Sequence, residues 1–418
     1  MDAIANNIAG IDIHKSMLAV VVRQQVGDTI TYIKRAFGTT KSEIEHLAAW
    51  LQHHEVAEAV MESTAQYWRP IWNGLECHFQ LHLTHPLKTR APRGRKRDFR
   101  DAQRLADRWH SKDLEESYIP RAEQREWRWL TRSRLQMKRK MTVMRNHVEG
   151  LLEQGGIKLT AVVTDIQGVS GWAMLERIAN GETNVDALLN EARGRLGKKK
   201  PQLREALLGN LAPVYRLILK QTMDQIRLLR NQVEEINAAL AEAMKDYVTV
   251  LVRLTKIPGI DLYAAQELLA EIGPTASAFP SASHFASWIG VCPGSQESAG
   301  VNYSPRSAKG NRYLRRLLCQ IAWAAVHAKD TFFNSLFHRL KPKIEGKGAA
   351  WAVAHRVAKI VWLVLHNGVD YEEKGPTPTD PRKQAKKFKR LVRTLTSQGF
   401  DVRALLDTEL AAVDVLGR

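Results

Sequence analysis

Residues 8–13 read Ile8-Ala9-Gly10-Ile11-Asp12-Ile13, an apolar run that carries one carboxylate near its end. Such a run predicts a buried strand. A second run, residues 56–64, reads Val56-Ala57-Glu58-Ala59-Val60-Met61-Glu62-Ser63-Thr64. A third segment, residues 98–106, has a helical pattern and opens with two acids at i and i+3, which share one side of a helix. Because charges have no packing reason to end apolar strands, we expect four carboxylates to meet at one edge of a sheet: Asp12, Glu62, Asp98 and Asp101.

Clustered carboxylates repel one another as bare anions and are stable around hard divalent cations, which take oxygen ligands. Four of them in this order suggest two-metal chemistry on phosphodiesters. The simpler interpretation is that each acid is a solvated surface charge or a helix cap, and Asp98 fits an N-cap. Both interpretations stay open on the residues alone.

The first 120 residues predict an α/β domain. Strand-like runs lie at 8–13, 17–24, 29–37, 56–63 and 79–84, and helical stretches lie at 41–53, at 67–77 and from Asp98 onward. Gly27-Asp28 is a hairpin signal between two of the strands. Three adjacent strands followed by alternating strands and helices fit a mixed sheet with helices packed on it, the order of an RNase H-like fold.

Residues 121–250 predict long helices with two apolar seams. The seams are Leu130, Met137, Met141, Met144, Val148 and Leu151, and Ile226, Leu229, Val233, Ile236 and Leu240. The seams suggest an antiparallel helical pair or an oligomerising coiled coil, and a plain helical core explains them equally well. Residues 194–201 between them predict a mobile basic loop.

Residues 251–370 predict helices with two informative turns. Ile257-Pro258-Gly259-Ile260 precedes a helix over 263–271 and resembles a helix-hairpin-helix turn, whose amides face a phosphate. Residues 290–300 predict a loop of small residues directly before a cationic helix. A serine there is usually a turn residue, but a serine placed directly before a cationic helix is also a candidate nucleophile aimed at a phosphate.

The 418-residue chain carries a formal net charge of +18 and a pI near 9.8, which favours a polyanionic partner. Lysine and arginine gather in four clusters, at 88–108, 121–145, 306–316 and 382–393. The candidate nucleic-acid contacts among them are Arg95, Lys96, Arg97, Arg306, Lys309, Arg312, Arg315 and Arg316.

Three cysteines, Cys77, Cys292 and Cys319, lack metal-ligand spacing and favour a reducing compartment. The N-terminal residues show no signal-peptide pattern, and the most apolar stretch, 357–365, is too short to span a bilayer. We therefore expect a bacterial cytoplasmic, nucleoid-associated protein without a membrane partner.

Three blocks of the first half resemble the acidic blocks of the DEDD transposases of insertion sequences, which include the pilin-gene DNA invertases and the bridge-RNA-guided recombinases. They are Gly10-Ile11-Asp12-Ile13-His14-Lys15, Met61-Glu62-Ser63-Thr64 followed by Tyr67-Trp68, and Asp98-Phe99-Arg100-Asp101-Ala102. Three later blocks are similar to that family's C-terminal domain: Ile257-Pro258-Gly259-Ile260, Pro293-Gly294 with Glu297-Ser298-Ala299-Gly300, and Lys309-Gly310-Asn311-Arg312-Tyr313-Leu314-Arg315-Arg316. The chain departs from the family pattern at Ala65 and at 301–303, and the resemblance is poor after about residue 330.

The resemblance implies four parts: a RuvC-like RNase H-fold domain over 1–120, a helical coiled-coil linker for oligomerisation over 121–250, a helical transposase domain over 251–370, and a basic extension over 371–418. It implies that Asp12, Glu62, Asp98 and Asp101 hold Mg²⁺. It also implies that Ser298 attacks a DNA phosphate and forms a phosphoserine link. The implied partners are double-stranded donor and target DNA, a noncoding bridge RNA, and further copies of the chain in a dimer or tetramer.

Two other classes of function remain open. In a metal-dependent nuclease or Holliday-junction resolvase, the carboxylates activate water and Ser298 is structural. In a non-enzymatic nucleic-acid scaffold, the acids are surface charges.

Overall fold

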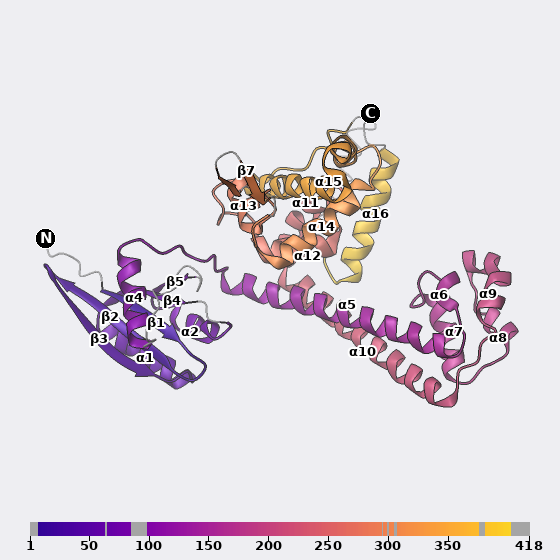
Figure 1. The fold of residues 1–418 in the computed structure, drawn as a ribbon, viewed down its shortest axis with the longest axis horizontal. Helices are drawn as coiled ribbons and strands as arrows, with labels where there is room; N and C mark the ends of the chain where they lie inside the picture. The colour runs from indigo at the N-terminus through magenta and orange to yellow at the C-terminus, as the bar shows by residue number, and fades with distance from the viewer. Residues whose placement is uncertain are drawn as a thin grey trace. The chain divides into compact units, whose positions relative to one another are not determined.

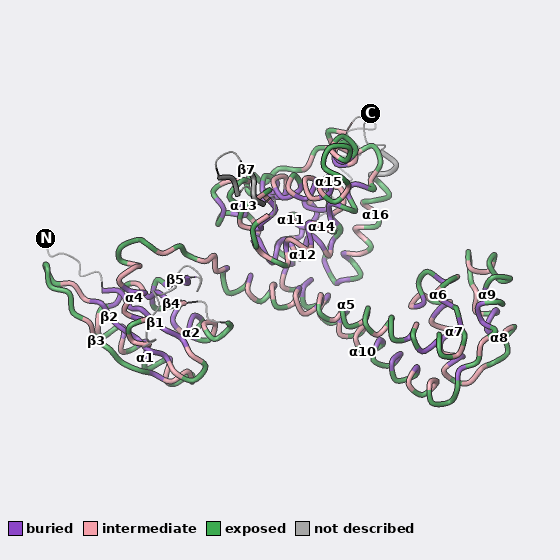
Figure 2. The backbone as a smooth tube through the Cα atoms, viewed as in Figure 1, coloured by how far each residue is buried: buried purple, intermediate pink, exposed green. Residues whose placement is uncertain are grey.

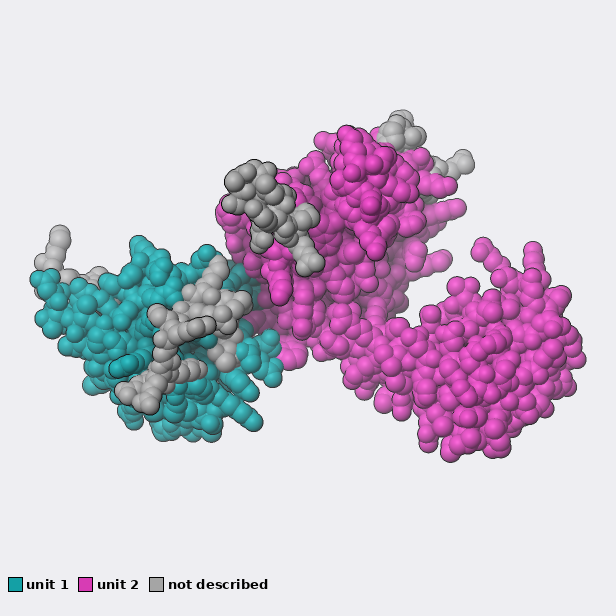
Figure 3. Space-filling model, in the orientation of Figure 1, with its two compact units in different colours: residues 1–122 teal, residues 123–418 magenta. Residues whose placement is uncertain are grey.

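The computed structural model describes residues 7–62, 65–84, 98–294, 296–298, 301–304, 307–375 and 381–402, with only the main chain at 296–298, 301–304 and 381–384. The chain divides into two compact units, Met1–Ala122 and Glu123–Arg418 (Figure 3). Each unit is described by itself below. The four-part division expected from the sequence stays a prediction.

The first unit is built on a mixed five-stranded sheet of order β3-β2-β1-β4-β5 (Figure 1). Its strands are β1 (Asn7–Ile13), β2 (Leu18–Val26), β3 (Thr29–Phe37), β4 (Val56–Glu62) and β5 (Gln80–Thr84). Strands β1, β2 and β3 pair antiparallel, whereas β4 runs parallel to β1 and β5 runs parallel to β4. The expected strands and the mixed sheet are therefore confirmed, and the turn at Gly27 joins β2 to β3 with a positive φ of 60°.

Helices cover both faces of this sheet. Helices α1 (Lys41–His53) and α2 (Trp68–Leu75) bury Leu47 and Ile71 against Ile11 and Met61 on one face. Helix α4 (Asp98–His110) packs on the other face with Leu105 and Ala106. Successive residues of a strand point to opposite faces, so the odd-numbered side chains of β1 build the larger core and the even-numbered ones face α4.

A glycine allows α4 to lie directly on β1. A Cβ built on Gly10 would stand 1.9 Å from the carbonyl oxygen of Ala102, which is closer than any real side-chain carbon can approach. The strand and the helix backbone are therefore in contact at this point. One helical turn before Ala102 lies Asp98, and two strand residues after Gly10 lies Asp12. The contact consequently sets the separation of the two carboxylates.

Polar contacts fix the last turns of α4 on the same face. Asp107 accepts a 2.8 Å hydrogen bond from the Tyr32 hydroxyl and lies 3.4 Å from Arg23 Nε. Burial, followed by the contact with Asp107, raises the pKa of Tyr32. Trp109 Nε1 donates to Glu58 Oε2 at 2.8 Å. These bonds tie the helix to β2, β3 and β4, so α4 is held along its whole length.

The second unit is helical apart from one short hairpin. Its elements are α5 (Ala122–Gln154), α6 (Leu159–Val162), α7 (Val169–Ala179), α8 (Val185–Leu189), α9 (Lys200–Ala206), α10 (Pro213–Ala243), α11 (Val248–Thr255), α12 (Leu262–Ile272), α13 (Ala282–Ile289), β6 (Gln296–Ser298), β7 (Val301–Ser304), α14 (Arg312–Val326), α15 (Phe332–His366) and α16 (Pro381–Ser397). Figure 2 shows buried residues gathered at both ends of the α5–α10 pair. One end packs with α6–α9, and the other with α11–α16.

The two long helices run antiparallel. Arg134 on α5 donates to Asn237 on α10 at 3.1 Å, and farther along α5 His147 lies 3.3 Å from the Thr222 hydroxyl. Arg134 is only 1% exposed and also donates to Gln266 of α12. The seams of apolar residues thus meet within one chain, and an additional role in oligomerisation stays a prediction.

Two segments differ from the sequence prediction. Residues 194–199 form a short 3-10 helix, η1 (Gly194–Lys199), that leads straight into α9 instead of a mobile loop. The turn at Pro258-Gly259 forms, but it faces α14: a Cβ on Gly259 would lie 2.5 Å from the carbonyl oxygen of Ile321. The Asp261 side chain accepts a bond from the Ala264 amide at the start of α12. The expected phosphate-facing amides are therefore already capped by a carboxylate.

Helix α15 is long and apolar enough to cross a membrane by length and composition, with a mean hydropathy of 1.3 over its most apolar window. However, 56% of that window is buried inside the unit. Its backbone is kinked at Ile344 and Glu345, just after Pro342. These features are typical of a core helix.

The close contact at Gly10 predicts that a methyl group added at this position lowers the stability of the first unit. Gly10→Ala should destabilise the first unit by roughly 1–3 kcal/mol, because the added carbon forces α4 away from β1. Gly150→Ala is the control, since a Cβ there meets nothing within 4 Å and alanine favours the helix. Urea unfolding monitored by circular dichroism measures both. A Gly10→Ala protein as stable as the wild type would contradict the close contact.

Candidate active site

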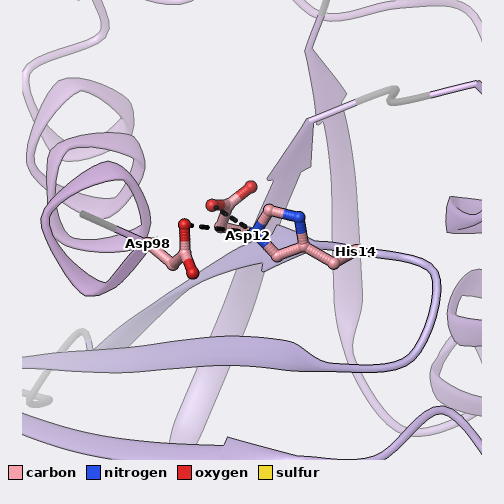
Figure 4. A group of neighbouring side chains, drawn as sticks. All are labelled: Asp12, His14 and Asp98. Carbon is pink, nitrogen blue, oxygen red and sulfur yellow. Dashed lines mark ion pairs between the residues drawn. The ribbon is translucent and has the colours of Figure 1, made fainter. Parts of the chain in front are cut away.

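The first site residues come from β1, whose side chains alternate between the two faces of the sheet. Gly10 and Asp12 lie on the face covered by α4, and His14 follows at the next even-numbered position. Asp98 comes from the first turn of α4 and is directed toward the same place (Figure 4). The site therefore stands where the end of a buried strand meets the start of a helix.

Three side chains meet there. His14 Nε2 lies 3.3 Å from Asp12 Oδ2 and 3.3 Å from Asp98 Oδ1 (Figure 4). One ligand atom from each residue falls within 4.8 Å of the other two. The side chain of Asp12 is 9% exposed, whereas those of His14 and Asp98 are 35% and 37% exposed. The group thus has one buried carboxylate and an open side through which a substrate can enter.

The donor set fits a divalent cation. Two carboxylate oxygens are ligands that Mg²⁺ and Mn²⁺ accept, and an imidazole nitrogen also suits transition metals. His14 was not predicted as a ligand, although its i+2 spacing from Asp12 at a strand end was a usable signal.

The other two predicted acids lie outside this group of three. Glu62 ends β4 directly after Met61, whose strand partner is Ile11 of β1. Asp101 Oδ1 is 2.8 Å from Arg104 Nη2, its i+3 neighbour on α4. Positions three residues apart lie only about 60° apart around a helix axis, so Asp98 and Asp101 share one side of α4, and the contact with Arg104 engages Asp101 there. The metal roles of Glu62 and Asp101 stay predictions.

Ser298 lies in a β-hairpin of the second unit, where the sequence predicted a loop. Strands β6 and β7 pair antiparallel, with Ser298 opposite Val301 and Gln296 opposite Ser304. The sequence signal was weak because β6 has only three residues. Ser298 is therefore next to the tip of a paired hairpin.

The base of this hairpin is closed by backbone contact. Gly290 ends α13 with a φ of 80°, and a Cβ on it would lie 2.5 Å from the carbonyl oxygen of Ala308. A Cβ on Gly310 would lie 2.0 Å from the carbonyl oxygen of Ile289. Only glycine fits at both positions, so the chain enters and leaves the hairpin at one fixed point.

Arg315 of α14 ties the two sides of this base together. Its Nη1 donates to the carbonyl oxygens of Gly290 and Ala308, the latter at 2.6 Å. Its Nη2 donates to the Ser307 hydroxyl at 3.1 Å. The guanidinium also lies over the ring of Trp351 at 4.9 Å. One side chain thus holds both ends of the hairpin against α14 and α15.

A buried carboxylate fixes the start of α14. Glu271 is 2% exposed and receives two bonds from Arg132, at 2.8 and 3.0 Å. It also accepts a 2.9 Å bond from the Asn311 amide. The Asn311 side-chain oxygen in turn caps the amides of Tyr313 and Leu314. Buried charge pairs with satisfied hydrogen bonds are costly to break. The first turn of α14 is therefore held firmly in place.

Of the predicted nucleic-acid contacts that the structure describes, two have partners inside the unit and two are exposed to solvent. Arg315 has the backbone partners just described, and Arg316 pairs with Glu267, whose pKa is raised by burial against the opposing effect of Arg316. Lys309 and Arg312 are exposed. Four further candidates, Arg95, Lys96, Arg97 and Arg306, lie outside the described residues. The nucleic-acid role of all eight stays a prediction, and Lys309 and Arg312 have the placement that suits it best.

Known proteins resemble both halves of the chain. A family model described as "Transposase", of the DEDD type, matches residues 9–156, and a model described as "Transposase IS116/IS110/IS902 family" matches residues 252–336. The "Probable family 20 transposase" of Pseudomonas aeruginosa is 23% identical over 304 residues, which cover 69% of this chain and 80% of that protein. The "Insertion element IS110 uncharacterized 43.6 kDa protein" of Streptomyces coelicolor is 31% identical over 130 residues, 29% of this chain and 30% of that protein.

The first match includes the predicted acids Asp12, Glu62, Asp98 and Asp101. The second includes the hairpin that bears Ser298 and the helices α13 and α14 on either side of it in the sequence. The two family matches identify a transposase, an enzyme that acts on DNA. The chain belongs to the IS110-type DEDD transposase family of insertion sequences.

Arg315 gives a prediction about the hairpin that needs no activity assay. Arg315→Lys keeps the charge but loses the fork that reaches Gly290 and Ala308. Amide hydrogen exchange of residues 290–311 should accelerate by about tenfold or more, corresponding to a loss of ~1.4 kcal/mol in local stability. Arg312→Lys, at an exposed position on the same helix, should leave this exchange unchanged. Equal exchange in both variants would show that Arg315 does not hold the hairpin.

Proposed function

We propose that this transposase cleaves and exchanges DNA strands with Ser298 as the nucleophile and with Mg²⁺ held by the acids of the first unit. The Ser298 hydroxyl loses its proton as its oxygen bonds to a DNA phosphorus. The bond from that phosphorus to one deoxyribose oxygen breaks, and this oxygen gains a proton. Attack by the hydroxyl of a second strand reverses the step, so that each broken phosphodiester is replaced and no bond energy is lost to water.

The observation that carries this proposal is the closed base of the serine hairpin. A nucleophile must be held in a near-attack position, because small misplacements cost large factors in rate. Gly290, Gly310 and Arg315 hold the two ends of a short hairpin that bears Ser298 next to its turn.

The acids of the first unit complete the proposal. A serine hydroxyl is a weak nucleophile and needs activation by a base or a metal. A bound divalent cation would supply Lewis acidity at the transferring phosphoryl group. Asp12 and Asp98 would hold it, with Glu62 and Asp101 as the further ligands expected from the sequence. His14 touches both carboxylates and can orient them or relay a proton.

The partners proposed for this reaction are double-stranded donor and target DNA and a noncoding bridge RNA that pairs with both. Base pairing would then supply the sequence information, as in other guided systems. A dimer or tetramer would bring the two DNAs together. The net charge of +18 supports binding to polyanions in general.

One observation favours a second candidate function, a metal-dependent nuclease or junction resolvase. His14 sits against two carboxylates at an open face, the surroundings of a general base that activates water. In that case Ser298 would only shape the hairpin.

Trapping of the intermediate separates the two candidates. With a nicked DNA substrate that prevents religation, the wild-type protein should form a covalent adduct that peptide mapping assigns to Ser298. Ser298→Ala should lose the adduct and recombination while keeping DNA affinity, because one hydroxyl adds little to a charge-dominated interface.

Ser304 serves as the matched control, because it lies in the paired strand of the same hairpin. Ser304→Ala should keep the adduct. If Ser298→Ala still cleaves strands at the wild-type rate with Mg²⁺, water is the nucleophile and the nuclease function is correct.

A further inference from the structure

Helix α16 lies beyond the residues that the family models match and has an unusual composition. Residues 381–400 contain seven lysines and arginines and no aspartate or glutamate. Its composition fits an added nucleic-acid arm and a solvated charged tail alike. The structure shows that the segment forms a helix from Pro381 to Ser397.

One side of α16 is docked on the second unit. Leu395 is fully buried, and Phe400 just beyond the helix is 5% exposed. Gln398 is also buried and accepts a 2.8 Å bond from Gln266 of α12. Because Gln266 also contacts Arg134, α16 joins the polar contacts that hold α5 to α12. The helix is therefore a fixed element of the unit.

The opposite side of α16 is a cationic face. Lys386, Lys389, Arg390 and Arg393 are exposed and follow the spacing i, i+3, i+4, i+7, which places them on one stripe of a helix. In the part of the chain that the structure describes, none of these four forms an ion pair with an acid. We call these four residues the α16 cationic face.

Several other exposed cations in the same unit have acidic neighbours. Arg227 pairs with Asp224 at 2.7 Å, and Lys245 pairs with Glu242 at 2.6 Å. Lys158 and Arg204 pair with Glu153 and Asp186. An ordinary solvated helix surface mixes both signs in this way. The α16 cationic face keeps four like charges together without compensation, which favours an anionic partner.

We propose that the α16 cationic face binds the phosphate backbone of duplex DNA, at a place separate from the serine hairpin. Its four charges extend over about 10 Å at a rise of ~1.5 Å per residue, and duplex DNA carries about one charge per 1.7 Å of its axis. A straight, docked helix suits a regular duplex, and the family acts on DNA. In Figure 1, α16 and β7 lie on opposite sides of the α11–α15 group. The contact would therefore hold DNA that flanks the reacting phosphate and would position without reading sequence.

A quadruple substitution in the full chain tests this proposal. Lys386, Lys389, Arg390 and Arg393 are changed to Gln, which keeps helix propensity and leaves Leu395 and Gln398 in place. The matched control changes Lys158, Arg204, Arg227 and Lys245 to Gln, which removes the same charge from exposed, acid-paired positions. Affinity for a 40-base-pair duplex of arbitrary sequence is measured from low to moderate salt. Circular dichroism confirms that both variants fold.

The α16 variant should bind DNA more weakly, and its slope of log affinity against log salt should fall in magnitude by roughly three to four. The control should keep a slope close to that of the wild type. Equal losses in both variants would show a general charge effect and overturn the proposal. A loss confined to structured RNA of equal length, with duplex DNA binding intact, would also overturn it and assign the face to RNA. Because only binding is measured, the result does not depend on the role of Ser298.

Discussion

The contact between Gly10 and the backbone of Ala102 is the constraint on which the candidate metal site depends. It brings helix α4 against strand β1 with no side chain between them, and the site carboxylates stand at the open end of that contact. The bonds of Asp107 and Trp109 hold the last turns of the helix on the same face of the sheet. Asp12 and Asp98 therefore approach each other because packing forces them together. A group of acids held in this way favours a cation, since like charges are otherwise costly to bury.

The second unit uses buried charge for a similar purpose. Glu271 and Arg315 lie on either side of the hairpin base and hold backbone and cap groups that would otherwise be free to move. These contacts change how the basic cluster at 306–316 is interpreted. Arg315 and Arg316 look like phosphate contacts in the sequence, yet both have internal partners in the fold. With Arg315 and Arg316 engaged inside the fold, the exposed positive charge that suits a polyanion lies on residues such as Lys309 and on α16.

The sequence predicted the sheet well because apolar alternation and the Gly27 turn are local signals. It also identified Asp12 and Asp98, whose positions follow from strand and helix periodicity. It missed His14, although the i+2 spacing from Asp12 was a usable signal, because the contact of His14 with Asp98 depends on where α4 lies. The pairing of Asp101 with Arg104 lies within α4, and the i, i+3 spacing allows it, but the sequence does not decide whether Asp101 pairs with Arg104 or joins the other acids. The hairpin of Ser298 escaped detection because its strands are too short for a pattern, and the docking of α16 depends on distant partners such as Gln266.

The central claim is that the end of β1 and the first turn of α4 together hold a divalent cation. Anomalous diffraction from crystals of the full chain grown with Mn²⁺ tests it directly, because the signal locates the ion without any assay of activity. We predict an anomalous peak bonded to Asp12 and Asp98 in the wild-type protein, and its loss in Asp12→Asn with the contact between Gly10 and Ala102 intact. A wild-type crystal at saturating Mn²⁺ with no peak at these residues, or an unchanged peak in Asp12→Asn, would contradict the account.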